Sequence, residues 1–298
     1  MNDCHRSVAI RFLSFAPNGE AGLIDPMKRR IINLLFCLSL ALSFSTSAAD
    51  KDQPKLGLQT WTCRNMDFEQ MVAFAVKHKL KYIQPFNKHI NPMGSKEETL
   101  AKKAVLDKHG LTCYTFGVTG TYKEKEKNRK LFEFAKLMNI KVIVVEPRDQ
   151  SQWDSLEELV KEYDIKLAIH NHGINSTYGS PEKVWKVLKN RDKRIGVCMD
   201  VGHITGAGFD AAKAFTEYKG RVYDIHLKDK KIEKVDGGKT VLLDVKVGTG
   251  SSNYDGLFKV LREAKWPGVL AIETDNGTFA RNPTDFVKAA IEYVKKSH

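Results

Sequence analysis

Histidines and carboxylates recur in this sequence, each directly after a short apolar run. These polar residues are Glu146, His170 with His172, Asp200 with His203, His226 with Lys228 and Asp229, and Glu273. Carboxylate and imidazole groups without neighbouring thiolates are ligands that suit Mn²⁺, Mg²⁺, Co²⁺ or Zn²⁺. Each residue alone is equally well explained as a helix cap or a turn residue, but the joint pattern predicts one divalent metal site.

A metal of this kind can bind the neighbouring carbonyl and hydroxyl oxygens of a sugar, and it stabilises the enediolate formed when a proton leaves the carbon between them. The proton also needs an acceptor. Alternation along a strand places His170 and His172 on one side, so one can lie near the metal while the other faces the substrate. His172 is the predicted general acid or base, because an imidazole exchanges protons near neutral pH. Glu146, Glu273 and Lys228 are further candidates for catalytic roles.

The runs that carry these residues belong to a regular alternation of strands and helices. The predicted strands cover residues 56–60, 82–85, 113–116, 142–146, 167–170, 196–200, 223–227 and 269–273. The predicted helices cover residues 68–78, 97–108, 130–138, 156–163, 181–188, 211–218, 257–264 and 285–296. Eight alternations favour a closed (β/α)₈ TIM barrel, and a doubly wound sheet would want a glycine-rich turn after its first strand. Barrel enzymes carry their chemistry at the C-terminal strand ends, which is where the polar residues fall.

The N-terminal region has the features of a signal peptide. Three basic residues at 28–30 precede an apolar run at 31–44 and small residues that end at Ala49. The run is short for a membrane span, so an uncleaved anchor is the weaker alternative. We expect residues 1–26 to be a non-native or disordered leader, residues 27–49 to be the signal peptide, and residues 50–298 to be one barrel domain. The protein is then periplasmic or secreted, without stable membrane insertion after cleavage.

Composition excludes some partners. The net charge of +12 comes mainly from lysines that alternate with glutamates, as at residues 123–127, and such runs are usually solvated helix faces. A nucleic-acid partner would want arginine and aromatic residues gathered on one face, and no such pattern is seen. Cys63, Cys113 and Cys198 form no CxxC pair, so we expect small buried residues and leave one disulfide pairing open. The oligomeric state is open as well.

Four motifs resemble the sugar phosphate isomerase/epimerase family, whose fold is the xylose-isomerase-like barrel. They are Leu-Ala-Ile-His-Asn-His-Gly at 167–173, Met-Asp-Val-Gly-His at 199–203, His-Leu-Lys-Asp at 226–229 and Ala-Ile-Glu at 271–273. The resemblance covers essentially residues 50–298, and it implies metal binding by Asp200, His226 and Glu273. His170 stands where the family more often has a glutamate. Either His170 replaces that ligand or Glu146 reaches across from the neighbouring strand, and we favour Glu146 with His170 close by.

Other residues at the strand ends are candidates for contacts with a small-molecule carbohydrate. Lys228 is expected either to polarise a substrate oxygen or hold an anionic group, or else to be a surface charge, and Asp229 is expected to orient His226. His203 and the ends of the first two strands complete the expected substrate contacts, with Gln59, Trp61 and Asn87 as the candidates.

Three functions fit this reading. Isomerisation or epimerisation of a sugar by proton transfer next to a carbonyl ranks first, and a lyase or dehydratase that eliminates from a keto-sugar or 3-keto-glycoside ranks second. A barrel that binds sugars without catalysis is third. AP endonuclease activity is disfavoured, because the ends of the second and third strands lack the additional histidines that such a zinc enzyme requires. Export disfavours phosphorylated sugars, which are mainly cytoplasmic.

Overall fold

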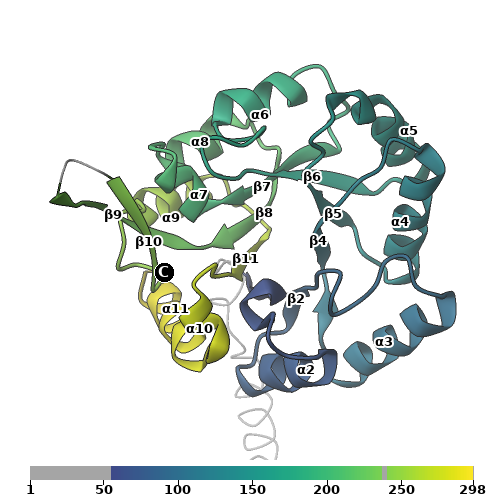
Figure 1. Cartoon of the computed structure of the whole chain (residues 1–298), viewed down its shortest axis with the longest axis horizontal. Helices are drawn as coiled ribbons and strands as arrows, with labels where there is room; N and C mark the ends of the chain where they lie inside the picture. The colour runs from purple at the N-terminus through teal and green to yellow at the C-terminus, as the bar shows by residue number, and fades with distance from the viewer. Residues whose placement is uncertain (1–54, 237–239, 298) are drawn as a thin grey trace, which may run out of the picture. The chain divides into compact units, whose positions relative to one another are not determined.

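A parallel β-sheet that nearly closes into a barrel forms the centre of the computed structural model, which describes residues 55–236 and 240–297 (Figure 1). Its strand order is β3-β2-β1-β11-β8-β7-β6-β5-β4. The strands are β1 (Lys55–Gln59), β2 (Tyr82–Gln84), β3 (Thr112–Cys113), β4 (Thr115–Thr119), β5 (Val142–Val145), β6 (Lys166–His170), β7 (Ile195–Asp200), β8 (Val222–Leu227) and β11 (Val269–Ile272).

The two ends of this sheet are parts of one interrupted strand. Only Tyr114 separates β3 from β4, and its amide donates to the carbonyl of Ile83 at 3.3 Å. The amide of Gly117 in β4 donates to the carbonyl of Pro85 at 2.9 Å, so β4 also bonds to the chain that follows β2. The predicted (β/α)₈ barrel is therefore confirmed, with its third strand broken in two.

Helices form a ring outside the strands (Figure 1). They are α2 (Phe68–Lys77), α3 (Lys96–Lys108), α4 (Lys125–Leu137), α5 (Trp153–Tyr163), α6 (Pro181–Leu188), α8 (Ala211–Glu217), α9 (Tyr254–Glu263) and α11 (Thr284–Ser297). Local sequence sets two of their starts, since Asp67 forms a capping box at α2 and Ser95 forms one at α3. The main core fills the space between this ring and the sheet. The strands are buried on both faces, as the four consecutive aliphatic residues of β5 show.

Among the elements that were not predicted, two short helices and a two-stranded hairpin lie beyond strand ends. A short helix α7 (Val201–Gly206) follows β7, and a second, α10 (Gly277–Arg281), follows β11. Strands β9 (Asp229–Lys234) and β10 (Thr240–Val245) pair antiparallel as a separate two-stranded sheet. β9 contacts α7, next to which it lies in Figure 1. The C-terminal face of the barrel therefore carries an added wall.

Two expectations concern the rest of the chain. Residues 1–49, with the expected leader and signal peptide, lie outside the described residues. No helix in the described part is long and apolar enough to cross a membrane. Cys63, Cys113 and Cys198 are buried, as expected for small core residues, and form no disulfide within the described part of the chain.

Gly196 allows β7 and β8 to pack closely. A Cβ built on Gly196 would lie 2.2 Å from the carbonyl oxygen of Arg221 and 2.3 Å from the ring of Tyr223. We expect Gly196→Ala to lower the free energy of unfolding by about 1–3 kcal/mol, because backbone and ring must shift to admit the methyl group. Thermal and urea unfolding measure this. Gly173→Ala, whose Cβ would meet nothing within 4 Å, is the matched control, and equal stability of both variants would contradict the packing account.

Candidate active site

Four side chains at the C-terminal ends of the strands turn their polar atoms toward one point. His170, Asp200, His226 and Glu273 are buried, and one potential ligand atom from each lies within 4.8 Å of the others. Asp200 Oδ2, His226 Nδ1, Glu273 Oε2 and both ring nitrogens of His170 are buried and form no hydrogen bond among the described residues. Three of these atoms have close ion-pair partners, which are Lys228 for the two carboxylate oxygens and Glu273 for His226 Nδ1. Buried polar atoms normally form hydrogen bonds, so a cluster of carboxylate oxygens and imidazole nitrogens without them suits a bound cation. Two imidazoles with two carboxylates fit a divalent transition metal.

Asp200 is positioned by the start of α7. Its Oδ1 accepts the amide of His203 at 2.8 Å as the helix cap, which leaves Oδ2 directed at the group. The side-chain amide of Asn171 in turn donates to the Asp200 carbonyl at 3.1 Å. Burial acts to raise the pKa of Asp200, but Lys228 and the nearby histidines outweigh it and hold this pKa well below its usual range. Asp200 is therefore an anionic ligand candidate.

His226 is held from behind by polar groups inside the barrel. Its Nδ1 lies 2.7 Å from Glu273 Oε2, while its Nε2 lies 2.7 Å from Gln84 Oε1 and 3.4 Å from Asp224 Oδ2. Asp224 is itself fixed by Gln84 at 2.9 Å and by the hydroxyl of Tyr114 at 2.7 Å. A proton on Nε2 that is donated to these oxygens leaves the Nδ1 lone pair free for a metal.

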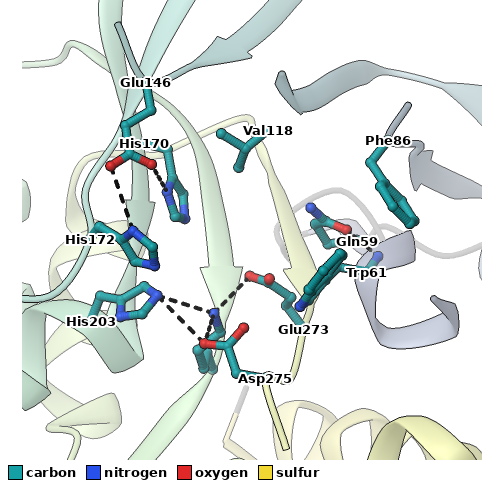
Figure 2. Close-up of a pocket in the computed structure, with 11 residues that line it drawn as sticks. Gln59, Trp61, Phe86, Val118, Glu146, His170, His172, His203, Glu273 and Asp275 are labelled. Atoms are coloured by element: carbon teal, nitrogen blue, oxygen red, sulfur yellow. Dashed lines mark hydrogen bonds and ion pairs between the residues drawn. The ribbon is translucent and has the colours of Figure 1, made fainter. Parts of the chain in front are cut away.

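Glu146 lies beside the group rather than within it. Its Oε2 is 3.7 Å from His170 Nδ1, and its Oε1 is 3.5 Å from His172 Nδ1 (Figure 2). His170 presents its other nitrogen, Nε2, toward Asp200 Oδ2 at 3.5 Å. Burial acts to raise the pKa of Glu146, but the two imidazoles outweigh it and lower this pKa to about 2. Glu146, which we favoured as the carboxylate ligand, thus contacts two histidines, and His170 occupies the fourth position of the group.

Lys228 is a buried cation at the same point and not a surface charge. Its Nζ lies 2.9 Å from Asp200 Oδ2, 3.3 Å from Glu273 Oε2 and 2.9 Å from Asp275 Oδ2. Gly202 makes room for it, because a Cβ there would lie 2.7 Å from Lys228 Cγ. Burial acts to lower the pKa of Lys228, but the three carboxylates outweigh it and keep the ammonium charged. Lys228 therefore offsets part of the negative charge of the site.

A pocket of about 230 Å³ opens above these groups, room for one small molecule. Trp61, Phe86 and Gln59 form one side of it, and Glu146, His172 and His203 form the other (Figure 2). The rings of Trp61 and Phe86 meet edge to face with centroids 5.3 Å apart. The remaining lining residues are Val118, His170, Lys228, Glu273 and Asp275. The pocket thus pairs an apolar wall with ionisable groups, which is typical of small-ligand sites.

Two predicted site residues lie elsewhere. Asp229 accepts the amides of Gly248, Gly250 and Ser252 at 3.0, 2.8 and 3.2 Å, so it fixes a loop and does not orient His226. Asp224 occupies the orienting position instead. Asn87 is exposed and does not line the pocket, because the chain turns outward after Phe86. Asp275 lines the pocket but was not predicted, although it follows Glu273 at the two-residue spacing that we used for the histidines.

The two aspartates allow a direct comparison. We expect Asp224→Asn to weaken metal binding by about 10–100-fold, because His226 Nε2 loses its charged acceptor and keeps only the neutral oxygen of Gln84. We expect Asp229→Asn to leave metal affinity unchanged and to lower the free energy of unfolding by about 1–3 kcal/mol, because it weakens three hydrogen bonds to a charged acceptor. Chelator competition and urea unfolding measure the two effects. A larger loss of metal affinity in Asp229→Asn than in Asp224→Asn would contradict this assignment.

Comparison with known proteins places this geometry in a family. An inosose dehydratase from Clostridium perfringens (strain 13 / Type A) is 26% identical over 286 residues, which cover 82% of this chain and 93% of that protein. The crystal structure of an uncharacterised protein from Parabacteroides distasonis is 27% identical with a TM-score of 0.63, and it covers 83% of this chain and all of that one. The IolI protein, crystallised with a zinc atom, shares the fold at 16% identity, with a TM-score of 0.67 and coverage of 82% and 97%.

A family model described as a xylose isomerase-like TIM barrel matches residues 72–297. The match spans most of the barrel and includes every strand-end residue of the four-residue group. The resemblance drawn from the sequence motifs is confirmed, and this chain belongs to the xylose isomerase-like TIM barrel family.

Proposed function

We propose that this chain is a metal-dependent lyase that eliminates water or an alcohol from a cyclic, polyhydroxylated ketone. The observation that carries this is the Glu146–His172 pair beside the four-residue group, since it places a proton acceptor next to the metal-ligand atoms inside a small pocket. Relatives that match most of the chain are named inosose dehydratase, which supports an enzyme acting on a sugar-like ketone.

The isomerase or epimerase that ranked first from the sequence is wrong. The motifs that suggested it belong to the metal site. After a proton is removed next to the carbonyl, the same site can support either reprotonation, which gives an isomer or epimer, or elimination. The curated relatives are dehydratases, which favours the lyase alternative. The fold and the site motifs alone do not distinguish an isomerase from a lyase, because both reactions begin with the same proton transfer.

The residues of the pocket can carry out an elimination. A divalent metal, when bound by His170, Asp200, His226 and Glu273, supplies Lewis-acid stabilisation for negative charge on the ketone oxygen. His172 takes the proton from the carbon next to the carbonyl at Nε2, while Glu146 at Nδ1 stabilises the resulting imidazolium. The carbon–oxygen bond one position further along then breaks, and the same proton passes to the departing oxygen. Loss of one molecule of water or alcohol leaves a carbon–carbon double bond conjugated to the carbonyl.

The place of this reaction in the cell is part of the same proposal. The basic and apolar pattern of residues 27–49 supports export to the periplasm or beyond, where substrates without phosphate groups are expected.

Product analysis tests the function directly. The full chain is loaded with Co²⁺, Zn²⁺ or Mn²⁺ and incubated with an inosose in deuterated water, and products are followed by NMR and mass spectrometry. We expect loss of one water per substrate molecule, and a decrease of about 100-fold in turnover for His172→Gln with metal content unchanged. An epimer that carries solvent deuterium and retains all its oxygen would refute the lyase assignment.

A further inference from the structure

A second cavity adjoins the pocket and shares two of its residues. It measures about 440 Å³ against about 230 Å³ for the pocket itself, and both are lined by His172 and His203. The centroids of these two rings lie 4.3 Å apart at an angle of 79°. The proton-transferring side of the pocket is therefore also the border of a larger space.

Elements outside the regular barrel build the far wall of this cavity. Leu242 of β10 and Lys230 of β9 line it together with Gly206 at the end of α7. A Cβ on Gly206 would lie 3.1 Å from Lys230 Cδ and 3.2 Å from Leu242 Cδ1, so the absence of a side chain lets both pack against the helix. The Nζ of Lys230 is held by Asp244 Oδ1 at 2.7 Å with both side chains mostly buried. The wall is thus anchored to the barrel.

The opposite wall is the segment that follows β6, and it combines apolar and polar groups. Ile174 and Leu242 are large apolar side chains that stay 47% and 44% exposed, and both line the cavity. Asn175 lines it too, and its side-chain amide can both donate and accept hydrogen bonds. A ligand with an apolar face and several hydroxyl groups would cover the aliphatic side chains and form hydrogen bonds with the side chain of Asn175. A sugar ring has both properties.

We propose that this cavity, lined by residues of 172–176, α7 and the β9–β10 hairpin, is a subsite for a sugar that leaves the reacting ring as an alcohol. The substrate is then a keto-glycoside rather than a free keto-sugar, which deepens the lyase function proposed above and rests on it. His172 removes the proton next to the ketone, the bond from the ring carbon to the bridging oxygen breaks, and His172 protonates that oxygen. The products are one unsaturated keto-sugar and one intact sugar that carries a free hydroxyl group. No oxidant is needed, because the substrate already carries its ketone.

Two neighbouring residues of β10 provide a matched test. Leu242 lines the cavity, whereas Leu243, 41% exposed, does not, and alternation along the strand turns the two side chains to opposite faces. Tryptophan suits an exposed strand position, so Leu242→Trp and Leu243→Trp should fold alike. Only Leu242→Trp should fill the subsite.

Each full-length variant is assayed with a 3-keto-disaccharide and with the corresponding methyl 3-keto-glucoside. For the parent and Leu243→Trp we expect a higher kcat/KM on the disaccharide. Leu242→Trp should lower kcat/KM on the disaccharide by about tenfold or more and leave the methyl compound within about twofold, because only the larger leaving group uses the subsite. Equal losses on both substrates, or no loss on either, would overturn the subsite.

Further outcomes distinguish a failure of the subsite proposal from a failure of the lyase proposal. If the parent dehydrates an inosose but does not cleave the disaccharide, the subsite is wrong and the lyase function stands. If the parent eliminates from no substrate, the lyase function fails. Calorimetric titration of the metal-loaded chains with the disaccharide then decides the subsite, which is supported by weaker binding in Leu242→Trp alone and refuted by equal binding in all three chains.

Discussion

Asp200→Asn is expected to abolish stoichiometric metal binding while the chain stays folded. Asp200 Oδ2 lies close to both imidazoles of the four-residue group, at 3.5 Å from His170 Nε2 and 3.6 Å from His226 Nδ1. Asparagine keeps an oxygen that can cap α7, because the amide of His203 needs only Oδ1. It removes the negative charge that a divalent cation requires. The loss of affinity should exceed the roughly 10–100-fold that follows from losing a supporting contact to a ligand.

Elemental analysis after reconstitution and chelator competition measure this loss. Asp210→Asn is the matched control, because Asp210 also caps a helix, accepting the amide of Lys213 at 2.8 Å, but lies outside the site. We expect the control to bind about one metal per chain like the parent, and circular dichroism should show both variants folded. A folded Asp200→Asn that binds metal as tightly as the control would refute the four-residue site.

The convergence of side chains at the strand ends was predictable, because one rule of barrel geometry places those ends together. Parallel strands of a barrel end on one face, so His170, Asp200, His226 and Glu273 had to converge once eight strands were assigned. Asp224 and Asp275 could have been found as well. Each lies two residues from a predicted ligand on the same strand or its extension, and side chains two apart share a face.

Other features depend on tertiary contacts that the local pattern does not contain. Asp229 follows His226 and Lys228 in one motif, but its partners come from residues 248–252, which return to it only after the β9–β10 hairpin. Nothing near Asp229 in the sequence indicates that return. The hairpin itself had a signal, since Asp236-Gly237-Gly238 between two β-prone runs favours a tight turn. A regular barrel connects its strands through helices, so the barrel pattern gives no reason to expect a hairpin there.

The choice between Glu146 and His170 depended on distance rather than on residue type. Both residues lie at the ends of neighbouring strands. In the family that the sequence motifs resemble, the fourth ligand is more often a carboxylate. In the structure, His170 lies between Glu146 and Asp200, with one ring nitrogen facing each. A carboxylate behind an imidazole fixes the ring and increases its basicity. The pair Glu146–His170 can therefore stand in for a single glutamate while it adds a nitrogen ligand.

His170→Glu is expected to change which metal the site prefers. The parent offers two nitrogen and two oxygen donors, a set that suits Zn²⁺ or Co²⁺, whereas the variant offers one nitrogen and three oxygens, which suits Mn²⁺ or Mg²⁺ better. We expect the ratio of Zn²⁺ to Mn²⁺ affinity to fall by about a hundredfold, as the softer donor is replaced by a harder one. Competition titrations give the ratio, and the visible spectrum of bound Co²⁺ reports the loss of an imidazole ligand.

Glu146→Gln separates the two roles of the neighbouring carboxylate. If Glu146 only supports His170, this variant should bind both metals about 10–100-fold more weakly, with their ratio and the Co²⁺ spectrum little changed. If Glu146 is itself a ligand, the ratio should shift toward Zn²⁺ and the spectrum should change, while His170→Glu should leave the ratio near that of the parent. The second pattern would refute the assignment of His170 as the fourth ligand, because a residue outside the coordination sphere cannot set the donor chemistry that selects the metal.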